Sequence, residues 1–138
     1  MSLTDDEREA IVSFRIQKAK DTLDEAEGIA TLGYWNAVAN RLYYACFYLT
    51  SALLLKNNYS AQTHSGIIHL LGMHFIKNDI VSKDAGRLYS QLFELRQTGD
   101  YDDLFNLSEE DVKPLILSAH NYVNELLVLI KGKVEKQG

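Results

Sequence analysis

The chain has 138 residues and a formal net charge of -5, from 19 acidic and 14 basic residues. This length fits a single domain, and the acidic balance excludes a broad basic surface for nonspecific nucleic-acid binding while leaving room for a small local basic site. One Pro and eight Gly residues leave little scope for a turn-rich β architecture, so the composition favours an all-helical domain over residues 1–138.

The first expected element is a long amphipathic helix from Asp5 to about Leu32, in which apolar residues recur at helical spacing. Thr4 suits the N-cap position, and Gly33 suits the position just after the helix. Because only this glycine separates the helix from the next periodic run, the two helices should form an antiparallel hairpin. Residues 1–4 and 134–138 are expected to fray.

The second expected helix, Tyr34 to Lys56, is apolar on most of its circumference, and the rest of the chain should pack around it. Its continuous apolar face is predicted to comprise Ala37, Val38, Tyr44, Ala45, Tyr48, Leu49 and Ala52. Arg41 interrupts this face near its middle. Cys46, the single cysteine, also lies in this helix, which indicates a buried thiol and a reducing, cytoplasmic location.

Two further helices follow after a turn. The third is expected from His64 to about Ile76, and the fourth is capped by Ser82 and runs to about Gln97 or Thr98, with Gly99 ending it. In the fourth helix the apolar and polar residues separate cleanly into two arcs. Arg96 falls inside the apolar arc.

The last helix has a capping signature at Ser108, but Pro114 predicts either a kink or a later start near Lys113. The helix should end near Lys133. The complete pattern predicts an antiparallel bundle of four long helices and one short helix. No apolar run approaches the roughly 20 residues of a membrane span, so no membrane partner is expected.

Arg41 and Arg96 share one property, because each interrupts an otherwise apolar face. A guanidinium cannot give up its proton, so a buried one requires a carboxylate, carbonyl groups or a ligand phosphate. In one interpretation acids of the bundle hold both arginines, with Asp100 as the best-placed acid. In the other, Arg41, Arg96 and Asp100, together with Tyr44 and Tyr101, line a site for an anionic ligand such as RNA phosphate.

The histidines and acids do not predict a metal site or a cofactor. His64, His69 and His74 are spaced by five residues, so they do not share a helix face as helical metal ligands do at a spacing of four. The acidic stretch from Asp100 to Asp111 is explained by a solvated loop and a capped helix start. The sequence also has no Gly-rich phosphate loop.

Three segments together resemble the HEPN domain family, in particular its small single-domain branch. They are AVANRLYYACFY in the second helix, THSGIIHLLGMHFI in the third and LYSQLFELRQTGDYDD at the end of the fourth. The resemblance covers about Lys18 to Leu127. It implies a HEPN helical bundle that is often dimeric, is commonly encoded beside a minimal nucleotidyltransferase partner, and acts as an RNA-directed toxin or RNA-binding module.

The resemblance also implies where a catalytic site would lie. Active HEPN ribonucleases carry an Arg followed, after roughly four to six residues, by a His, and two copies form a metal-independent RNA cleavage site. Arg96 matches this arginine, but Tyr101, Asp102 and Asp103 occupy the window of the histidine. Proton transfer would then require Tyr101, or His64 or His120 if the fold brings one beside Arg96.

The sequence therefore predicts a dimeric, toxin-antitoxin-like HEPN module that binds RNA, a nucleotide or a nucleotidyltransferase partner without the family's standard catalytic pair. One alternative is a metal-independent ribonuclease with a different proton-transfer residue. The other is a protein-interaction bundle in which the arginines only hold helices together.

Overall fold

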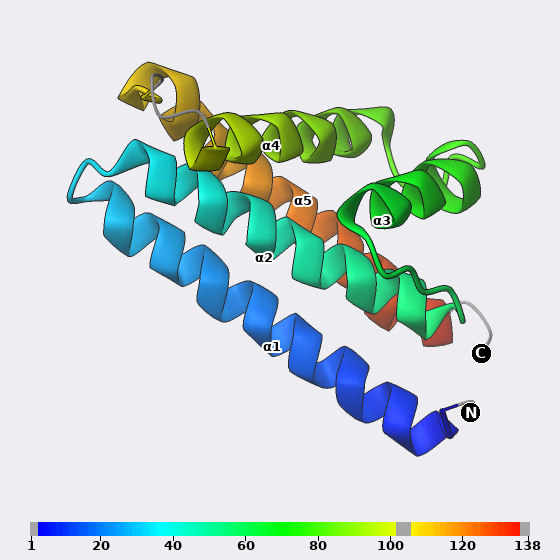
Figure 1. Cartoon of the computed structure of the whole chain (residues 1–138). Coiled ribbons are helices and arrows are strands. Elements are labelled where there is room, and N and C mark those ends of the chain that lie inside the picture. Colours follow the sequence, from blue (N-terminus) through cyan, green and yellow to red (C-terminus); the bar gives the residue numbers. More distant parts are fainter. Residues whose placement is uncertain (1–2, 102–105, 136–138) are drawn as a thin grey trace.

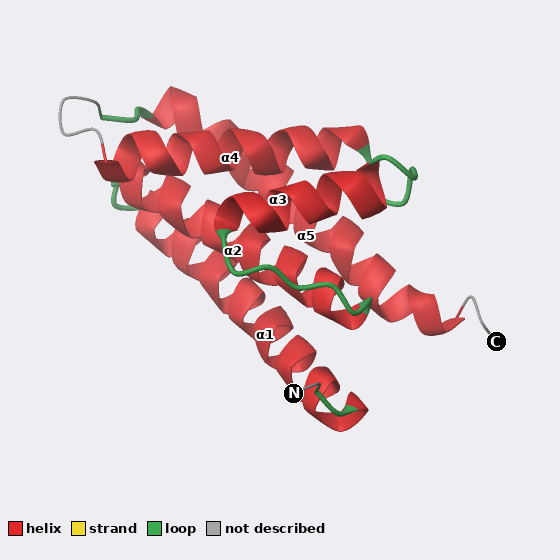
Figure 2. Cartoon of the chain, turned by 45° about the vertical axis from the view of Figure 1, so that its right-hand side comes forward, coloured by secondary structure: helices red, strands yellow, loops and turns green. Residues whose placement is uncertain are grey.

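The fold was obtained as a computed structural model that describes residues 3–101 and 106–135, with residues 99–101 and 133–135 described by their backbone alone. Its elements in chain order are α1 (Asp5–Ala30), α2 (Trp35–Lys56), α3 (His64–Leu71), η1 (Gly72–Ile76), α4 (Lys83–Tyr101) and α5 (Glu109–Glu135). The described residues contain helices and loops and no strand (Figure 2). The predicted all-α bundle is confirmed.

Helices α1 and α2 lie side by side as an antiparallel hairpin (Figure 1). The start of α1 is fixed by a capping box, in which the Thr4 hydroxyl accepts a bond from the Glu7 backbone N–H at 3.1 Å and the Glu7 carboxylate accepts one from the Thr4 N–H at 2.8 Å. Helix α1 ends at Ala30, two residues before the predicted Leu32. Gly33 then takes a φ of 78°, which a glycine adopts without steric cost and which turns the chain into α2.

Helix α2 is the centre of the bundle and contacts α1, α3, α4 and α5. Because neighbours pack on several of its sides, its buried arc is wider than predicted and differently placed. Tyr43 is fully buried although it lies outside the predicted apolar face, and Cys46 is fully buried, which confirms the predicted buried thiol. Ala37 is exposed, so the predicted face is wrong there, whereas Tyr44 and Tyr48 are half-buried and pack against the core.

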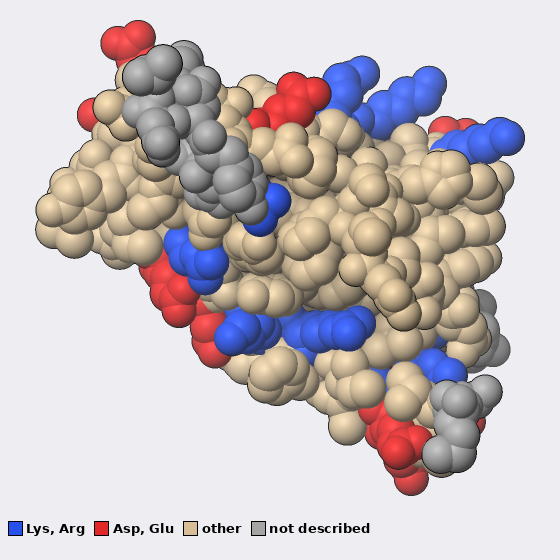
Figure 3. Space-filling view, viewed as in Figure 1, with Lys and Arg blue, Asp and Glu red and all other residues tan. Residues whose placement is uncertain are grey.

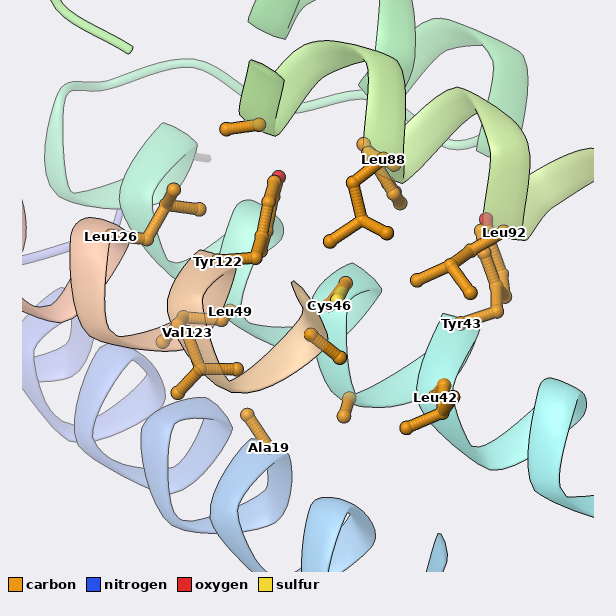
Figure 4. Close-up of a cluster of buried hydrophobic side chains, with 14 of the residues drawn as sticks. Ala19, Leu42, Tyr43, Cys46, Leu49, Leu88, Leu92, Tyr122, Val123 and Leu126 are labelled. Atoms are coloured by element: carbon orange, nitrogen blue, oxygen red, sulfur yellow. The ribbon is translucent and has the colours of Figure 1, made fainter. Parts of the chain in front are cut away.

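The core surrounds α2, where α1, α4 and α5 pack against it (Figure 4). The Tyr122 hydroxyl of α5 meets the Thr50 hydroxyl of α2 at 2.6 Å, and both side chains are buried. Burial also raises the pKa of the Cys46 thiol, which keeps it protonated. None of the described helices combines the length and apolar character that a bilayer crossing requires.

The third helical segment spans His64 to Ile76 as predicted, although it is α-helical only to Leu71 and continues as the π-helical turn η1. The predicted end of the fourth helix is wrong. The fourth helix passes through Gly99 to Tyr101, because a glycine inside a helix costs only about 1 kcal/mol and does not by itself end one.

The fifth helix takes the earlier of the two starts left open by the sequence. Ser108 and Asp111 cap it reciprocally, since the Asp111 N–H donates to the Ser108 hydroxyl at 3.2 Å and the Ser108 N–H donates to the Asp111 carboxylate at 3.0 Å. Pro114 lies inside the helix.

Candidate functional site

Arg96 lies on α4 where this helix passes over α2, and its guanidinium is placed against two aromatic rings. Its central carbon is 5.4 Å from the centroid of the Tyr44 ring and 5.6 Å from that of Tyr43. One of its terminal nitrogens donates a hydrogen bond to the Tyr44 hydroxyl at 3.0 Å. The rings therefore hold a cation at the half-buried edge of the bundle.

Arg41 reaches the same ring from the previous turn of α2, with its guanidinium carbon also 5.4 Å from the Tyr44 centroid. It donates two hydrogen bonds to the Asn40 side-chain oxygen, at 2.8 and 3.1 Å, and a longer one of 3.4 Å to Glu25 of α1. The Arg41 side chain keeps 29% of its surface exposed. Two guanidinium groups thus share one tyrosine ring, and at least one of them is accessible to a ligand.

His64, the first residue of α3, lies against the rings of Tyr43, Tyr44 and Phe47. The Thr63 hydroxyl caps α3 by accepting a bond from the Gly66 N–H at 2.9 Å, and this fixes the position of the first helical residue. The His64 ring stacks on Phe47 with centroids 4.5 Å apart, and its Nδ1 is 2.5 Å from the Tyr43 hydroxyl. No described residue bonds to its other ring nitrogen, Nε2.

Burial, and secondly the positive charge of Arg96, lower the pKa of His64. The imidazole is therefore neutral at physiological pH and can accept a proton. Burial shifts the pKa of Tyr43 in the opposite direction. It raises this pKa to about 12, although a hydrogen bond and the nearby Arg96 charge act to lower it. It stays protonated and acts as a positioning residue, since its ring lies under Arg96 and its hydroxyl holds His64.

We call Arg41, Tyr43, Tyr44, His64 and Arg96 the cation–ring cluster. It combines charged donors suited to phosphate, an aromatic face suited to a base and a neutral imidazole suited to proton transfer. Two hollows, of about 580 and 700 Å³, lie on either side of α4, but neither combines charged donors, an aromatic face and an imidazole in this way. Within the described residues, no group of three or more His, Cys, Asp or Glu side chains could hold a metal ion.

The structure brings four of the residues singled out in the sequence to one place: Arg41, Tyr44, His64 and Arg96. The side chains of Asp100 and Tyr101 lie outside the described residues, as do Asp102 and Asp103 entirely. The expected pairing of Arg41 with Asp100 and the proposed role of Tyr101 therefore stay predictions.

His120 is placed elsewhere, on α5, where it pairs with Glu27 of α1. Of the two histidines considered as substitutes for the missing one, His64 is the one that the fold brings beside Arg96.

Sequence reasoning missed Tyr43 and Phe47 as the residues that hold His64. The available signal was their spacing of four residues, which places both rings on one side of α2. The missing information was the return of the chain through residues 57–63, which sets the start of α3 against that side.

Residues 12–129 match the HEPN domain. The chain belongs to the HEPN family. A Thermotoga maritima relative, named UPF0332 protein, is 36% identical over 125 residues, covering 91% of this chain and 95% of its own length. Two Methanocaldococcus jannaschii proteins, "Putative toxin MJ0142" and "Putative toxin MJ0605", are 27% and 28% identical, covering 80% and 94% of this chain and 75% and 95% of their own lengths.

A similar helical fold is also seen in a solved structure. The crystal structure of TT1696 from Thermus thermophilus superposes with a TM-score of 0.67, covering 88% of this chain and 97% of that one, at 19% identity. At this identity the likeness supports the helical architecture alone.

Proposed function

We propose that this HEPN domain is a toxin-like module that binds single-stranded RNA at the cation–ring cluster. The observation that carries the proposal is that Arg41 and Arg96 both lie over the Tyr44 ring at an accessible edge of the bundle. The relatives named as toxins and the HEPN membership support RNA as the target.

The chemistry of the cluster suits a single strand. Guanidinium groups form charge-assisted bonds with phosphate, and an aromatic face stacks a base with about 1–3 kcal/mol. Bases are free to stack on protein rings only where they are not paired in a duplex. The guanidinium planes of Arg41 and Arg96, together with the half-buried Tyr44 ring, would provide such a stacking surface, and His64 Nε2 would accept a hydrogen bond from a ribose hydroxyl.

The test is fluorescence anisotropy with a labelled single-stranded RNA of about 8 nucleotides. Because a hydrogen bond to a charged group contributes about 1.5–3 kcal/mol, Arg96→Ala and Arg41→Ala should each weaken binding about 10- to 100-fold. Arg87→Ala is the matched control, since Arg87 also lies on α4 but is 73% exposed and pairs with Asp84. Binding that is unchanged by both cluster substitutions would contradict the assignment of the site.

A second candidate function is metal-independent RNA cleavage, which the position of His64 beside Arg96 favours. The ribose 2′-hydroxyl would attack the adjacent phosphorus, with its proton passing to His64 Nε2. The bond from phosphorus to the 5′-oxygen would break, and that oxygen would take a proton from water, leaving a 2′,3′-cyclic phosphate. Arg96 would stabilise the added negative charge on the phosphate.

This candidate predicts cleavage that persists in EDTA and is lost in His64→Ala while RNA binding is retained. His69→Ala is the matched control, because His69 is an exposed histidine of the same helix. Since the neutral imidazole is the active form and its pKa is lowered, the cleavage rate should rise with pH below the ordinary histidine value of about 6.5 and be level at neutral pH. Cleavage that survives in His64→Ala would exclude this role.

We also propose that the chain forms a homodimer and binds a nucleotidyltransferase partner, as its HEPN membership suggests. Light scattering should then give about twice the chain mass of 15.7 kDa. The rival interaction bundle predicts no RNA binding and a strong loss of stability in Arg41→Ala, which thermal unfolding of the same variants would detect.

A further inference from the structure

A small pocket lies beside the cation–ring cluster, between α1, α2 and the segment that leads into α3. Its volume is about 210 Å³, below the range of roughly 300–1,000 Å³ typical of sites for drug-sized ligands. Arg15 of α1, Tyr48 and Ser51 of α2, and Tyr59 and Ser60 of the connecting segment contribute to its lining. With Phe47, which also lines it, the pocket combines one cation, three aromatic rings and two serine hydroxyl groups.

Arg15 is half-buried and forms no ion pair or hydrogen bond with any residue that the structure describes. Burial lowers its pKa, and no neighbouring acid offsets this effect. Other cations near the α1–α2 hairpin have partners, since Arg8 bonds to Asp5 at 3.1 Å and Lys56 bonds to Glu9 at 2.7 Å. A half-buried guanidinium left open in this way is suited to an anion from outside the chain.

The rings of the pocket are held in place and carry a second cation. The Lys18 ammonium lies 5.8 Å from the centroid of the Tyr48 ring. Tyr59 stacks on His74 of η1 with centroids 4.2 Å apart and planes within 15°. The π-helical turn that interrupts the third helix therefore supports one wall of the pocket.

The pocket adjoins the cation–ring cluster, because the ring centroid of Tyr48, which lines the pocket, is 5.9 Å from that of Tyr44. From Arg41 to Ser51 the α2 helix rises about 15 Å. A stacked strand rises about 3.4 Å per nucleotide, so this stretch matches roughly four nucleotides. Figure 3 shows Lys and Arg side chains in a row along this face, over the boundary between α1 and the rest of the bundle.

We propose that Arg15, Lys18, Tyr48 and Tyr59 form a second RNA subsite, which takes a phosphate and a base of the strand bound at the cation–ring cluster. This inference rests on the proposed function and extends it from one binding site to two adjacent subsites along one RNA strand, which together we call the track. Alternation of cations with rings favours a nucleic acid over an acidic peptide, because a peptide would use the cations and leave the rings without a matching partner.

The experiment compares two single-stranded RNAs, of about 2 and about 8 nucleotides, binding to the full chain. The test variant is Arg15→Gln with Lys18→Gln. The charge-matched control is Lys20→Gln with Arg87→Gln, which removes two equally positive but exposed side chains. Lys18→Gln alone is included because Lys18 is exposed and its replacement leaves the fold intact. Circular dichroism checks every variant.

For the longer RNA, the test variant should bind at least about 10-fold more weakly than the control, since two charged contacts are lost. The slope of log K against log salt should fall in magnitude by about 1.4, because each phosphate neutralised on a single strand contributes about 0.7. For the shorter RNA the test variant and the control should bind alike. Lys18→Gln should give about half of the change in slope.

Equal binding of the longer RNA by the test variant and the control, with Arg96→Ala still defective, would overturn the second subsite and leave the proposed function standing. Equal weakening of both RNAs by the test variant would also overturn it, because a subsite along a track acts only on a strand that reaches it. Failure of the wild type to bind either RNA would overturn both proposals. Tighter binding of an acidic peptide than of either RNA, measured in the same way, would also overturn both proposals.

Discussion

Replacing Tyr43 with Phe would remove a single hydroxyl from the centre of the site. The ring would stay in place, packed against Tyr44, Phe47, Tyr89 and Phe93 at centroid distances between 5.1 and 6.0 Å. What is lost is the 2.5 Å hydrogen bond to His64.

One such bond contributes a net stabilisation of about 0.5–1.5 kcal/mol, and half-buried His64 can recover part of it from water. We therefore expect Tyr43→Phe to lower the free energy of unfolding by about 1 kcal/mol, or to lower Tm by about 3–5 °C for a domain of this size. Tyr43→Ala also empties the ring's volume and should cost about 3–5 kcal/mol.

Urea denaturation followed by circular dichroism would measure both variants, with Tyr34→Phe as the control because Tyr34 is 64% exposed. RNA binding should persist in Tyr43→Phe, while cleavage should fall because His64 is no longer oriented. A stability loss equal to that of Tyr43→Ala, or none beyond that of the control, would refute the view that Tyr43 serves chiefly to position His64.

Four further predictions concern buried or charged groups. Arg96→Ala should raise the pKa of His64 towards its ordinary value, since Arg96 helps to lower it, and an NMR titration of the imidazole would detect the shift. Because the folded protein holds His64 at a lowered pKa, stability should fall as pH drops below about 6.5, and His64→Gln should reduce this loss in pH-dependent unfolding. Native Cys46 should not react with a thiol reagent until the chain unfolds, because it is buried and protonated. Tyr122→Phe should cost about 0.5–1.5 kcal/mol in urea denaturation, since one buried hydrogen bond is lost while the Thr50 hydroxyl keeps its bond to the Cys46 carbonyl.

Helical periodicity and capping residues predict the fold well, because both act locally along the chain. Thr4 and Ser108 cap the helices that they were expected to cap. The wrong stop at Gly99 shows the limit of this reasoning, since packing along α4 outweighs the modest helix penalty of one glycine. The exposure of Ala37 has a related cause, because which side of α2 is buried depends on where its neighbours lie.

The site was predictable only in part. Arg41 and Arg96 could be identified because a charge on an apolar arc requires a special environment. The contact of His64 with Tyr43 could not, because it joins residues 21 positions apart through the path of a connecting segment. Arg15 and Lys18 gave no signal either, since basic residues on an amphipathic helix are normally solvated.

Two guanidinium groups over one Tyr44 ring also make the empty protein sensitive to its buffer. Their like charges repel each other, and the Tyr44 ring, the Asn40 side-chain oxygen and the 3.4 Å ion pair of Arg41 with Glu25 offset part of this repulsion. A small anion that settles between them would relieve the repulsion and bind the folded chain alone, so phosphate or sulfate should raise Tm by mass action. Arg41→Gln should then lose most of this dependence of Tm on anions, which gives the cluster a measurable signature before any RNA is known.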